Sequence, residues 1–431
     1  MDTNLEKVVN LGKKVKSISN QGTNIAALKR QNQSLVLSII KEYGPISRVA
    51  IARETGLTKS AISKVVGNLI RVGLVEEAGT DDTFVGRKPV TLRLSTNNYF
   101  VVGVGVGRTK ISVGIANLEG NIIARKTTSL RKDDTQEIIL RKIVNLIYQI
   151  TKYSNVEMKK IIGIGIGSPG PLYAHSGIIL SPPNFPGWHD VPLKKLIREE
   201  FKIPVFIDND ANVAALAEKW FGNGKGIDNF IFLLLDVGIG AGIVINGEIY
   251  RGVDGVAGEF GHTSISLAGK RCECGNYGCL ENFASCFAIV SKVKNLISSG
   301  RETIITKMVK GRVENIEIET IIEAARKRDA LSLQILREAA RYLSIGIANL
   351  VNLFNTKTII LGGRLMGAGE ILLDPVRKMV KKRVYLVTGK NLQIIPSYFG
   401  EEIHVVGACA LALSYLFKDL GLIKERLTVK M

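Results

Sequence analysis

Residues 259–281 read EFGHTSISLAGKRCECGNYGCLE and carry one imidazole and three thiols within eighteen residues. The four donors follow the pattern H-x9-C-x-C-x4-C and are His262, Cys272, Cys274 and Cys279. Zinc prefers four tetrahedral nitrogen and sulfur donors, and a Cys3His set closes that shell without leaving a position for water. Gly275 and Gly278 lie between the second and third thiols, where a tight loop must turn its backbone. The pattern predicts a structural zinc ion; the alternative is three unpaired thiols beside a buried histidine.

The composition is that of a globular protein with a large positive charge. A chain of 431 residues is too long for one hydrophobic core and predicts two or three domains. The formal net charge is +19, which favours a polyanionic partner. Residues 1–98 contain 15 lysines and arginines against 8 acidic residues, so the positive charge is densest in this N-terminal part.

Neither a secretion signal nor a membrane span is expected. The N-terminal sequence MDTNLEKVVNLGKKVKS has charges throughout and lacks an apolar core of signal-peptide length. The most apolar run, residues 230–245, is interrupted by Asp236 and is too short to cross a bilayer. Five cysteines, three of them in the predicted metal cluster, suit a reducing compartment. We therefore expect a cytoplasmic protein without a membrane partner.

Residues 28–97 are predicted to form a winged helix-turn-helix domain, preceded by an N-terminal tail over residues 1–27. Within the segment SRVAIARETGLTKSAISKVVGNLIRVG, Ser47 is a candidate cap for one helix and Thr58 for the next. Gly56 stands between them, where the turn needs a left-handed residue. The apolar residues of the second helix follow helical spacing and are expected to pack inward: Ile62, Val65, Val66, Leu69 and Ile70.

The opposite face of this second helix is predicted to read DNA. Its polar and basic residues are Lys59, Ser60, Ser63, Lys64 and Asn68. Two strands, residues 74–77 and 90–94, flank the loop GTDDTFVGRKP, which would form a wing with Arg87 and Lys88 near its tip. Recognition-helix side chains read base edges, while phosphate contacts orient the protein. The alternative is an αα-hairpin whose polar face is only solvated.

Residues 98–431 are predicted to form an internally duplicated α/β body. Residues 100–130, FVVGVGVGRTKISVGIANLEGNIIARKTTSL, predict three short strands. Residues 230–252, FIFLLLDVGIGAGIVINGEIYRG, repeat the strand, glycine-rich turn and strand about 130 residues later. Helices are expected after each opening and in a last apolar helix over residues 405–417. The repeat is typical of the actin-like sugar-kinase architecture, in which the ligand lies between two lobes.

Residues 208–210, Asp-Asn-Asp, are candidates for contact with a ligand. They follow a predicted strand over 205–207 and precede a predicted helix over 212–221, where α/β sheets place their ligands. A carboxylate and an amide can accept hydrogen bonds from sugar hydroxyls or donate to them, and Asp210 could also act as a general base. The alternative is a turn with an Asp N-cap.

Two further carboxylates flank the predicted metal ligands. Glu259 precedes His262, and Glu281 follows Cys279, so a zinc-bound loop would fix both carboxylates. His262 could bind the metal through one ring nitrogen and present the other nitrogen to a hydroxyl.

The chain resembles the ROK family, which groups repressors, open reading frames and sugar kinases. The resemblance covers nearly the whole chain and is carried by E-x-G-H followed by C-x-C-G-x-x-G-C-L-E. It implies a monosaccharide pocket formed by Asn184 in PNFPGW, Asn209 and Asp210 in NDAN, Glu259 and His262 in E-x-G-H, and Glu281 after the last cysteine. In kinase members the residue matching Asp210 is the catalytic base, so this chain has a catalytic residue only if it is a kinase.

The expected ATP side departs from the family pattern. The family's kinases open with D-x-G-G-T-K, whereas residues 105–110 read GVGRTK, so Gly105 replaces the carboxylate and Arg108 places a bulky cation in the turn. The second phosphate loop, usually G-T-G-x-G, begins here with Asp236, whose charge repels phosphate. We therefore predict that the chain is not an enzyme.

The leading interpretation is a sugar-responsive transcriptional repressor of carbohydrate-utilisation genes, xylose genes among them, similar to the family's xylose and N-acetylglucosamine repressors. A homodimer, or a dimer of dimers, would place two winged helices on double-stranded operator DNA. A monosaccharide effector that closes the lobes would weaken operator binding. The alternatives are an ATP-dependent sugar kinase with an accessory N-terminal domain and a DNA-binding regulator controlled by a protein partner.

Overall fold

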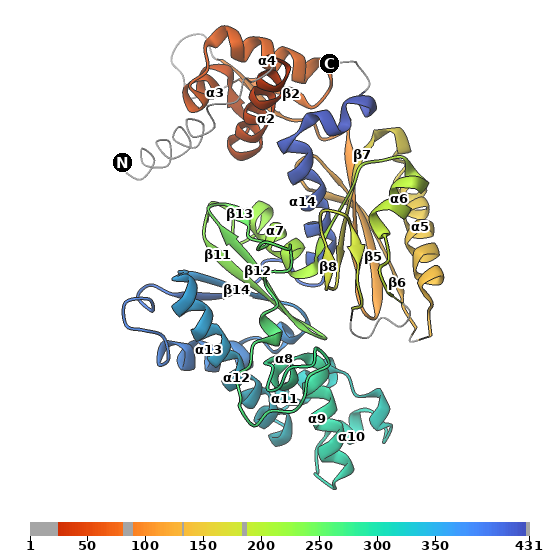
Figure 1. Ribbon diagram of the computed structural model, residues 1–431, viewed down its shortest axis with the longest axis vertical. Coiled ribbons are helices and arrows are strands. Elements are labelled where there is room, and N and C mark those ends of the chain that lie inside the picture. The colour runs from red at the N-terminus through yellow and green to blue at the C-terminus, as the bar shows by residue number, and fades with distance from the viewer. Residues whose placement is uncertain (1–24, 81–88, 132, 183–187, 428–431) are drawn as a thin grey trace.

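The computed structural model describes residues 25–80, 89–131, 133–182 and 188–427. Most of the predicted tail, residues 1–24, lies outside the described residues, and so do Arg87, Lys88 and Asn184. The described chain forms an N-terminal domain and two lobes, with the N-terminal domain at one end of the molecule (Figure 1).

The N-terminal domain packs three helices against a small antiparallel sheet. Its elements are α2 (Ile25–Tyr43), β1 (Ile46–Ser47), α3 (Arg48–Thr55), α4 (Lys59–Arg71), β2 (Val75–Thr80) and β3 (Val90–Leu94), and the strand order is β1-β3-β2. The Ser47 side chain accepts a hydrogen bond from Ala50 N at the start of α3, and Thr58 accepts one from Ala61 N at the start of α4. Gly56 lies between the helices with a φ of 69°, in the left-handed region. The predicted helix-turn-helix is confirmed with its caps.

The first lobe is built on a five-stranded sheet of order β10-β7-β4-β5-β6. Its strands are β4 (Phe100–Val106), β5 (Lys110–Asn117), β6 (Ile122–Ser129), β7 (Ile161–Ser168) and β10 (Val205–Asn209). Helices α5 (Gln136–Tyr153) and α6 (Leu193–Phe201) and the hairpin β8 (Leu172–Tyr173) and β9 (Ile178–Ile179) belong to the same lobe. Strands β4, β5 and β6 are antiparallel neighbours, whereas β7 and β10 join in parallel.

The second lobe repeats this arrangement. Its sheet has the order β13-β12-β11-β14-β15, in which β11, β12 and β13 are antiparallel and β14 and β15 are parallel. The strands are β11 (Phe230–Leu235), β12 (Ile239–Ile245), β13 (Glu248–Ile249), β14 (Thr358–Gly362) and β15 (Gln393–Pro396). The helices are α8 (Glu281–Ala284), α9 (Cys286–Ser298), α10 (Ile305–Met308), α11 (Ile318–Arg326), α12 (Ala330–Phe354) and α13 (Glu370–Lys381). The matching strand orders confirm the predicted duplication.

Two buried helices hold the lobes together, α7 (Asp210–Phe221) and α14 (Ile403–Lys418). Helix α14, expected from the sequence over residues 405–417, lies against β4 and β7 of the first lobe and also against α7. Glycines in the sheet allow this close approach, because a Cβ at Gly165 would lie 1.8 Å from the Ala408 carbonyl oxygen. Helix α7 begins at residue 210, two residues before the predicted start at residue 212, because Asn209 takes the N-cap position.

The N-terminal domain shares its apolar core with these two helices. Buried residues of α2 and α4, such as Leu37 and Ile62, belong to one continuous cluster with Val213 of α7 and Leu413 of α14. Two other clusters fill the outer part of the first lobe and the helical part of the second lobe. None of the described helices is both long enough and apolar enough to cross a membrane.

Candidate functional site

The exposed face of α4 carries four of the residues predicted to read DNA. Lys59, Ser60, Ser63 and Lys64 are all exposed, while Ile62 and Leu69 on the opposite face are fully buried. Because the apolar stripe packs against the rest of the domain, the polar and basic side chains face outward. The chain thus presents a short basic helix surface of the kind that helix-turn-helix proteins place in the major groove.

Asn68 was predicted to share this outward face, and that prediction is wrong. Its side chain is only 7% exposed. The helical repeat places residue 68 between residues 64 and 65 around the axis, at the border of the apolar stripe, where packing excludes water. A side chain in this position cannot reach a base edge without a change in packing, so Asn68 is removed from the candidate DNA contacts.

The predicted metal ligands converge in the structure. The ligand atoms of His262, Cys272, Cys274 and Cys279 all lie within 4.8 Å of one another, and none of these cysteines forms a disulfide. The Cys274 and Cys279 sulfurs are 3.7 Å apart, and the Cys272 sulfur lies 3.6 Å from His262 Nδ1. A tetrahedral zinc ion with bonds of about 2.3 Å would hold its sulfurs about 3.8 Å apart. The donor set and its spacing therefore fit a metal ion of this kind.

The loop that carries these ligands has the backbone that its glycines permit. Gly275 and Gly278 have φ values of 91° and 70°, and a Cβ at Gly278 would lie 1.9 Å from the Ser266 carbonyl oxygen. His262 turns Nδ1 toward the thiols, while its Nε2 lies 3.9 Å from Glu259 Oε2. This is the predicted arrangement, in which one ring nitrogen faces the metal position and the other faces away from it.

A large cavity brings together the polar residues expected in the pocket. It has a volume of about 910 Å³ and lies between the two lobes. Its lining includes Asn209, Asp210, Glu259, His262 and Glu281. A Cβ at Gly170 would lie 2.8 Å from Asn209 Nδ2 and 3.4 Å from Glu259 Oε1, so the two side chains face the same glycine. Apart from Asn184, which lies outside the described residues, the residues predicted to form the pocket therefore line one cavity.

At the strand-to-helix junction over residues 208–210, some side-chain atoms are used in hydrogen bonds within the chain and others remain available to a ligand. The Asn209 side chain caps α7 by accepting a hydrogen bond from Ala211 N at 2.9 Å. The alternative of an Asp N-cap at this turn is therefore wrong in its residue, because Asn209 takes the N-cap position. Glu281 Oε2 accepts a hydrogen bond from Ile239 N at 2.8 Å, which fixes this carboxylate at the base of the cavity. Asp210 accepts only from Ala211 N among the described residues, so its second carboxylate oxygen remains available.

Burial raises the pKa of Asp210 to about 7, against the opposing effect of the Arg108 guanidinium, with Asp236 and Glu259 adding to the rise. The folded protein therefore binds a proton that the unfolded chain has lost between about pH 4 and pH 7. The free energy of unfolding contributed by this group falls as the pH rises through that window. Above pH 7, where Asp210 is ionised in both the folded and the unfolded protein, the loss of unfolding free energy has reached its full value.

We therefore expect Asp210→Asn to stabilise the ligand-free protein above pH 7, by at most about 4 kcal/mol if the whole pKa shift is relieved at 1.36 kcal/mol per unit. The gain should fade toward pH 4, where the unfolded carboxyl also becomes protonated. Urea unfolding at pH 4.5 and pH 8 measures it. Asp254→Asn, at an exposed carboxylate, is the matched control without such a gain. An equal effect of Asp210→Asn at both pH values would contradict the prediction.

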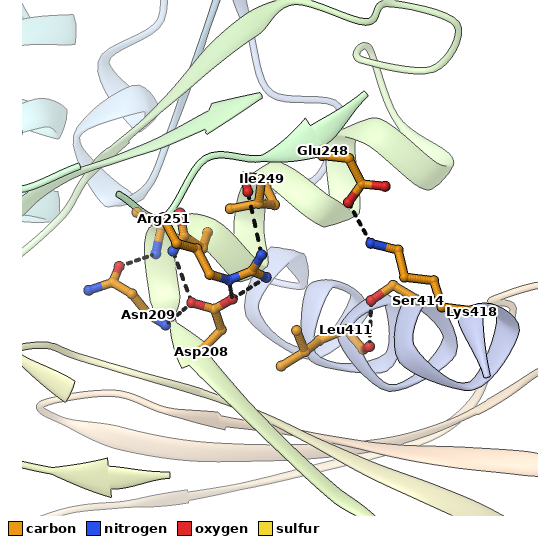
Figure 2. Close-up of polar contacts among 10 residues, drawn as sticks. Asp208, Asn209, Glu248, Ile249, Arg251, Leu411, Ser414 and Lys418 are labelled. Carbon is orange, nitrogen blue, oxygen red and sulfur yellow. Dashed lines mark hydrogen bonds and ion pairs between the residues drawn. The ribbon is translucent and has the colours of Figure 1, made fainter. Parts of the chain in front are cut away.

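A buried ion pair beside this junction was not foreseen from the sequence (Figure 2). Asp208 is 1% exposed, and its Oδ2 accepts hydrogen bonds from Arg251 Nε at 2.9 Å and Nη2 at 2.6 Å. Its Oδ1 accepts from Asn209 N at 2.8 Å and from Asn212 Nδ2 at 2.9 Å. Asp208 lies on β10 of the first lobe, whereas Arg251 follows β13 of the second, so the pair joins the lobes next to the candidate pocket.

The other end of the cavity is lined by residues that sequence reasoning largely missed. Lys110 Nζ lies 2.5 Å from Glu401 Oε2. Arg364 makes a bidentate ion pair with Glu319, in which Nε and Nη2 donate to the two carboxylate oxygens at 2.8 and 2.7 Å. Burial raises the pKa of Asp236, against the effects of His404 and Arg364. The cations Lys110 and Arg364 thus already have carboxylate partners within the chain.

The chain is similar to two known protein families and to named transcriptional regulators. Residues 101–415 match the ROK family, and residues 28–82 match the MarR family. The xylose repressor of Caldicellulosiruptor bescii is 36% identical over 391 residues, which cover 91% of this chain and 97% of the relative. The DNA-binding transcriptional dual regulator NagC of Escherichia coli is 30% identical over 390 residues, covering 90% and 93% of the two chains.

Solved structures agree with this assignment. A ROK family transcriptional regulator, described as a homolog of the E. coli MLC protein, superposes with a TM-score of 0.79 at 30% identity and covers 93% of this chain and 99% of its own. A ROK family glucokinase from Streptomyces griseus, in complex with glucose and AMPPNP, gives a TM-score of 0.66 at 33% identity and covers 73% of this chain and 99% of its own. The chain belongs to the ROK family and combines an actin-like body with a MarR-type DNA-binding domain.

Proposed function

We propose that this protein is a sugar-responsive transcriptional repressor of carbohydrate-utilisation genes. The observation that carries the proposal is the presence, in one chain, of an outward basic face on α4 and of an acid- and amide-lined cavity between two lobes. The relative named xylose repressor matches 91% of the chain, and the solved ROK family transcriptional regulator covers 93% of it. We assign DNA binding to residues 28–97 and sugar binding to residues 98–431, with residues 1–27 as a tail.

The effector is a monosaccharide bound at the zinc-loop side of the cavity. At the start of α7, Asn209 donates to a sugar hydroxyl through Nδ2 and Asp210 accepts from a hydroxyl through its second carboxylate oxygen. From their positions in the metal loop, Glu259 and Glu281 accept hydrogen bonds from sugar hydroxyls. His262 donates or accepts through Nε2, which faces away from the thiols. Asn184 is proposed to contact the sugar only because it matches a sugar-contact position of the family. Xylose and N-acetylglucosamine, the sugars in the relatives' names, are the first candidates.

The cavity does not support phosphoryl transfer. Gly105 lacks the carboxylate with which a kinase holds its metal ion, and Asp236 would repel phosphate oxygens. Arg108 lies 3.4 Å from the position of a Cβ at Gly238, so its guanidinium projects over the second glycine-rich turn. Two other cations at this end, Lys110 and Arg364, are paired with carboxylates of the chain itself. We therefore propose a repressor without catalytic residues.

The four metal ligands hold a structural zinc ion. A closed Cys3His shell leaves no coordination position for a substrate, and its contribution is to fold the loop between Glu259 and Glu281. The repressor acts in the cytoplasm as a homodimer, or a dimer of dimers, on double-stranded operator DNA. A two-fold symmetric protein places two recognition helices one helical turn, or a multiple of it, apart.

Fluorescence anisotropy of the full-length protein on its own upstream DNA, at near-physiological salt and with a panel of monosaccharides, tests this function. Specific binding that one sugar releases supports the proposal and identifies the effector. Specific binding that no sugar changes rejects the sugar response and favours control by a protein partner. Absence of specific binding rejects the repressor role, and an ATP-coupled assay with the same sugars then tests the kinase alternative.

Within this proposal, Lys64→Ala and Ser63→Ala are each expected to weaken operator binding by about 1–3 kcal/mol, the usual range for one specific base contact. Both side chains are exposed on α4, so neither substitution removes a core contact. Anisotropy on operator and on scrambled DNA measures the loss. Val49→Ala on the neighbouring helix α3, also exposed, should change operator affinity little. Equal losses on the two DNAs would show that these side chains contact phosphate and not bases.

A further inference from the structure

Helix α7 reaches from the candidate sugar pocket to the N-terminal domain. Its first residue is Asp210 and its last is Phe221, so its 12 residues span about 18 Å. Every residue from Ala211 to Glu218 is buried. A helix that is buried on all sides cannot bend independently of its neighbours, because packed interiors transmit displacements.

Each lobe holds α7 through buried polar groups. At the N-terminal end, Asn212 donates to Asp208 of the first lobe. Asp208 also accepts hydrogen bonds from Arg251 of the second lobe (Figure 2). Near the C-terminal end, Glu218 is fully buried and accepts hydrogen bonds from Ser397 Oγ at 2.5 Å and Tyr398 N at 3.0 Å, in the loop after β15. A change in the angle between the lobes must therefore move α7.

The C-terminal end of α7 contacts the DNA-binding domain. The Lys41 ammonium on α2 lies 3.2 Å from the centre of the Trp220 ring. Trp220 also lies against Phe417 of α14, with ring centres 5.7 Å apart. A cation over a tryptophan face is worth about 0.5 to 2 kcal/mol, depending on how far it is removed from water. Burial, and to a smaller extent Lys219 and Lys225, lowers the pKa of Lys41 to about 7 against the effect of Glu42.

The space around this contact allows movement. A cavity of about 410 Å³ lies beside it, lined from the DNA-binding domain by residues such as Lys41 and Arg93 and from the body by residues such as Trp220 and Lys225. Because side chains do not fill this cavity, Lys41 and Trp220 can change their relative position there with less repacking than the shared apolar core would require. The ring contact is thus a localised connection within a loosely packed part of the interface.

We propose that α7 transmits sugar binding to the DNA-binding domain, with Trp220 and Lys41 as the positioning residues at its far end. The inference rests on the proposed function and specifies how its two sites communicate. Sugar contacts at Asp210 favour one arrangement of the lobes, and α7 carries that arrangement to Trp220. The altered position of α2 then lowers the affinity of the DNA-binding domain for the operator. Both sites bias one two-state element, as coupling requires.

The test measures the coupling ratio, which is the operator Kd with saturating sugar divided by the operator Kd without sugar. It uses full-length protein and the sugar identified in the panel above. Trp220→Leu removes the ring but keeps an apolar side chain, and Lys41→Met removes the charge but keeps the length. Couplings of this type usually reach about 5- to 150-fold. In both variants we expect the ratio to fall to within about twofold of one, while sugar affinity measured without DNA stays within about threefold of the parent.

Two further variants separate transmission from simple loss of structure. Lys41→Arg keeps a cation over the ring, so its coupling ratio should equal that of the parent protein and exceed that of Lys41→Met. Ser34→Ala removes another contact between the domains, the hydrogen bond from Ser34 Oγ to the Lys418 carbonyl at 3.0 Å, and should leave the ratio unchanged because this contact does not involve α7. By linkage, operator DNA must change sugar affinity by the same factor as sugar changes operator affinity in each variant.

The outcomes distinguish failure of the proposed sugar-responsive function from failure of the proposed role of α7. A parent protein whose operator binding ignores every sugar rejects the proposed function and the inference together. A parent protein that responds to sugar, with Trp220→Leu and Lys41→Met responding equally well, rejects only the role of α7. Loss of the response in Ser34→Ala to the same degree would also reject it, because the effect would then follow from any weakening of the interface.

Discussion

Replacement of Arg251 by methionine is expected to lower the free energy of unfolding by about 3–5 kcal/mol. Arg251 donates twice to Asp208, whose side chain is 1% exposed. Methionine fills a similar volume but leaves the carboxylate buried without its cation. The hydrogen bonds that remain to Asp208, from Asn209 N and Asn212 Nδ2, do not neutralise the charge. Urea unfolding of the full-length variant, read as a lower midpoint at unchanged slope, measures the loss.

A double variant separates the ion pair from other effects of the substitution. Asp208→Asn combined with Arg251→Met removes both charges, so most of the lost stability should return. The exposed pair between Glu248 and Lys418 provides the matched control, because its side chains are 56% and 61% exposed. Lys418→Met should therefore cost less than about 1 kcal/mol. If Arg251→Met costs no more than Lys418→Met, the buried pair does not join the lobes as described.

The helix-turn-helix could be predicted because its signals are local. Ser47 and Thr58 cap helices that begin at the next residue, and Gly56 supplies the left-handed turn between them. Each of these effects depends on residues within four positions in the chain. Asn68 shows where such reasoning stops. A residue at the border of an apolar stripe is buried or exposed according to what packs there, which the helical repeat alone does not determine.

The candidate site divides in the same way. The metal cluster was predictable because its four ligands fall within eighteen residues. Asn209 and Asp210 were candidates from their place after a predicted strand, whereas Asn184 and the sugar-binding role of the full set came only from the resemblance to a family. The ion pair of Asp208 with Arg251 spans 43 residues, and that of Lys110 with Glu401 spans 291. Neither pair leaves a periodic or spacing signal in the chain. Trp220 and Lys41 are 179 residues apart in the chain and meet only through tertiary packing.

The second large effect is expected at the metal loop. Cys274→Ser should lower the bound metal from one ion per chain to nearly none and weaken sugar binding at least about tenfold, with the sugar-free affinity for operator DNA retained. Apparent binding free energies of structural zinc are about 10–16 kcal/mol in small domains, so the proposed ion would contribute strongly to the folding of this loop. The described loop has little regular structure besides two isolated bridges, Ser264 with Cys279 and Arg271 with Tyr277. Without the metal, these bridges and a few hydrogen bonds across the loop, such as that from Ile265 N to the Gly278 carbonyl, must order it.

The loss should reach the sugar site because the loop ends in its carboxylates. Glu259 lies three residues before His262, and Glu281 follows Cys279 by two and holds Ile239 N. Metal analysis, calorimetry with the identified sugar and anisotropy on the operator give three independent readouts. Cys286→Ala, at a buried thiol outside the cluster, should keep the metal and the sugar affinity. Normal metal content in Cys274→Ser would contradict the ligand set, and metal loss without a change in sugar affinity would show that the loop does not support the pocket.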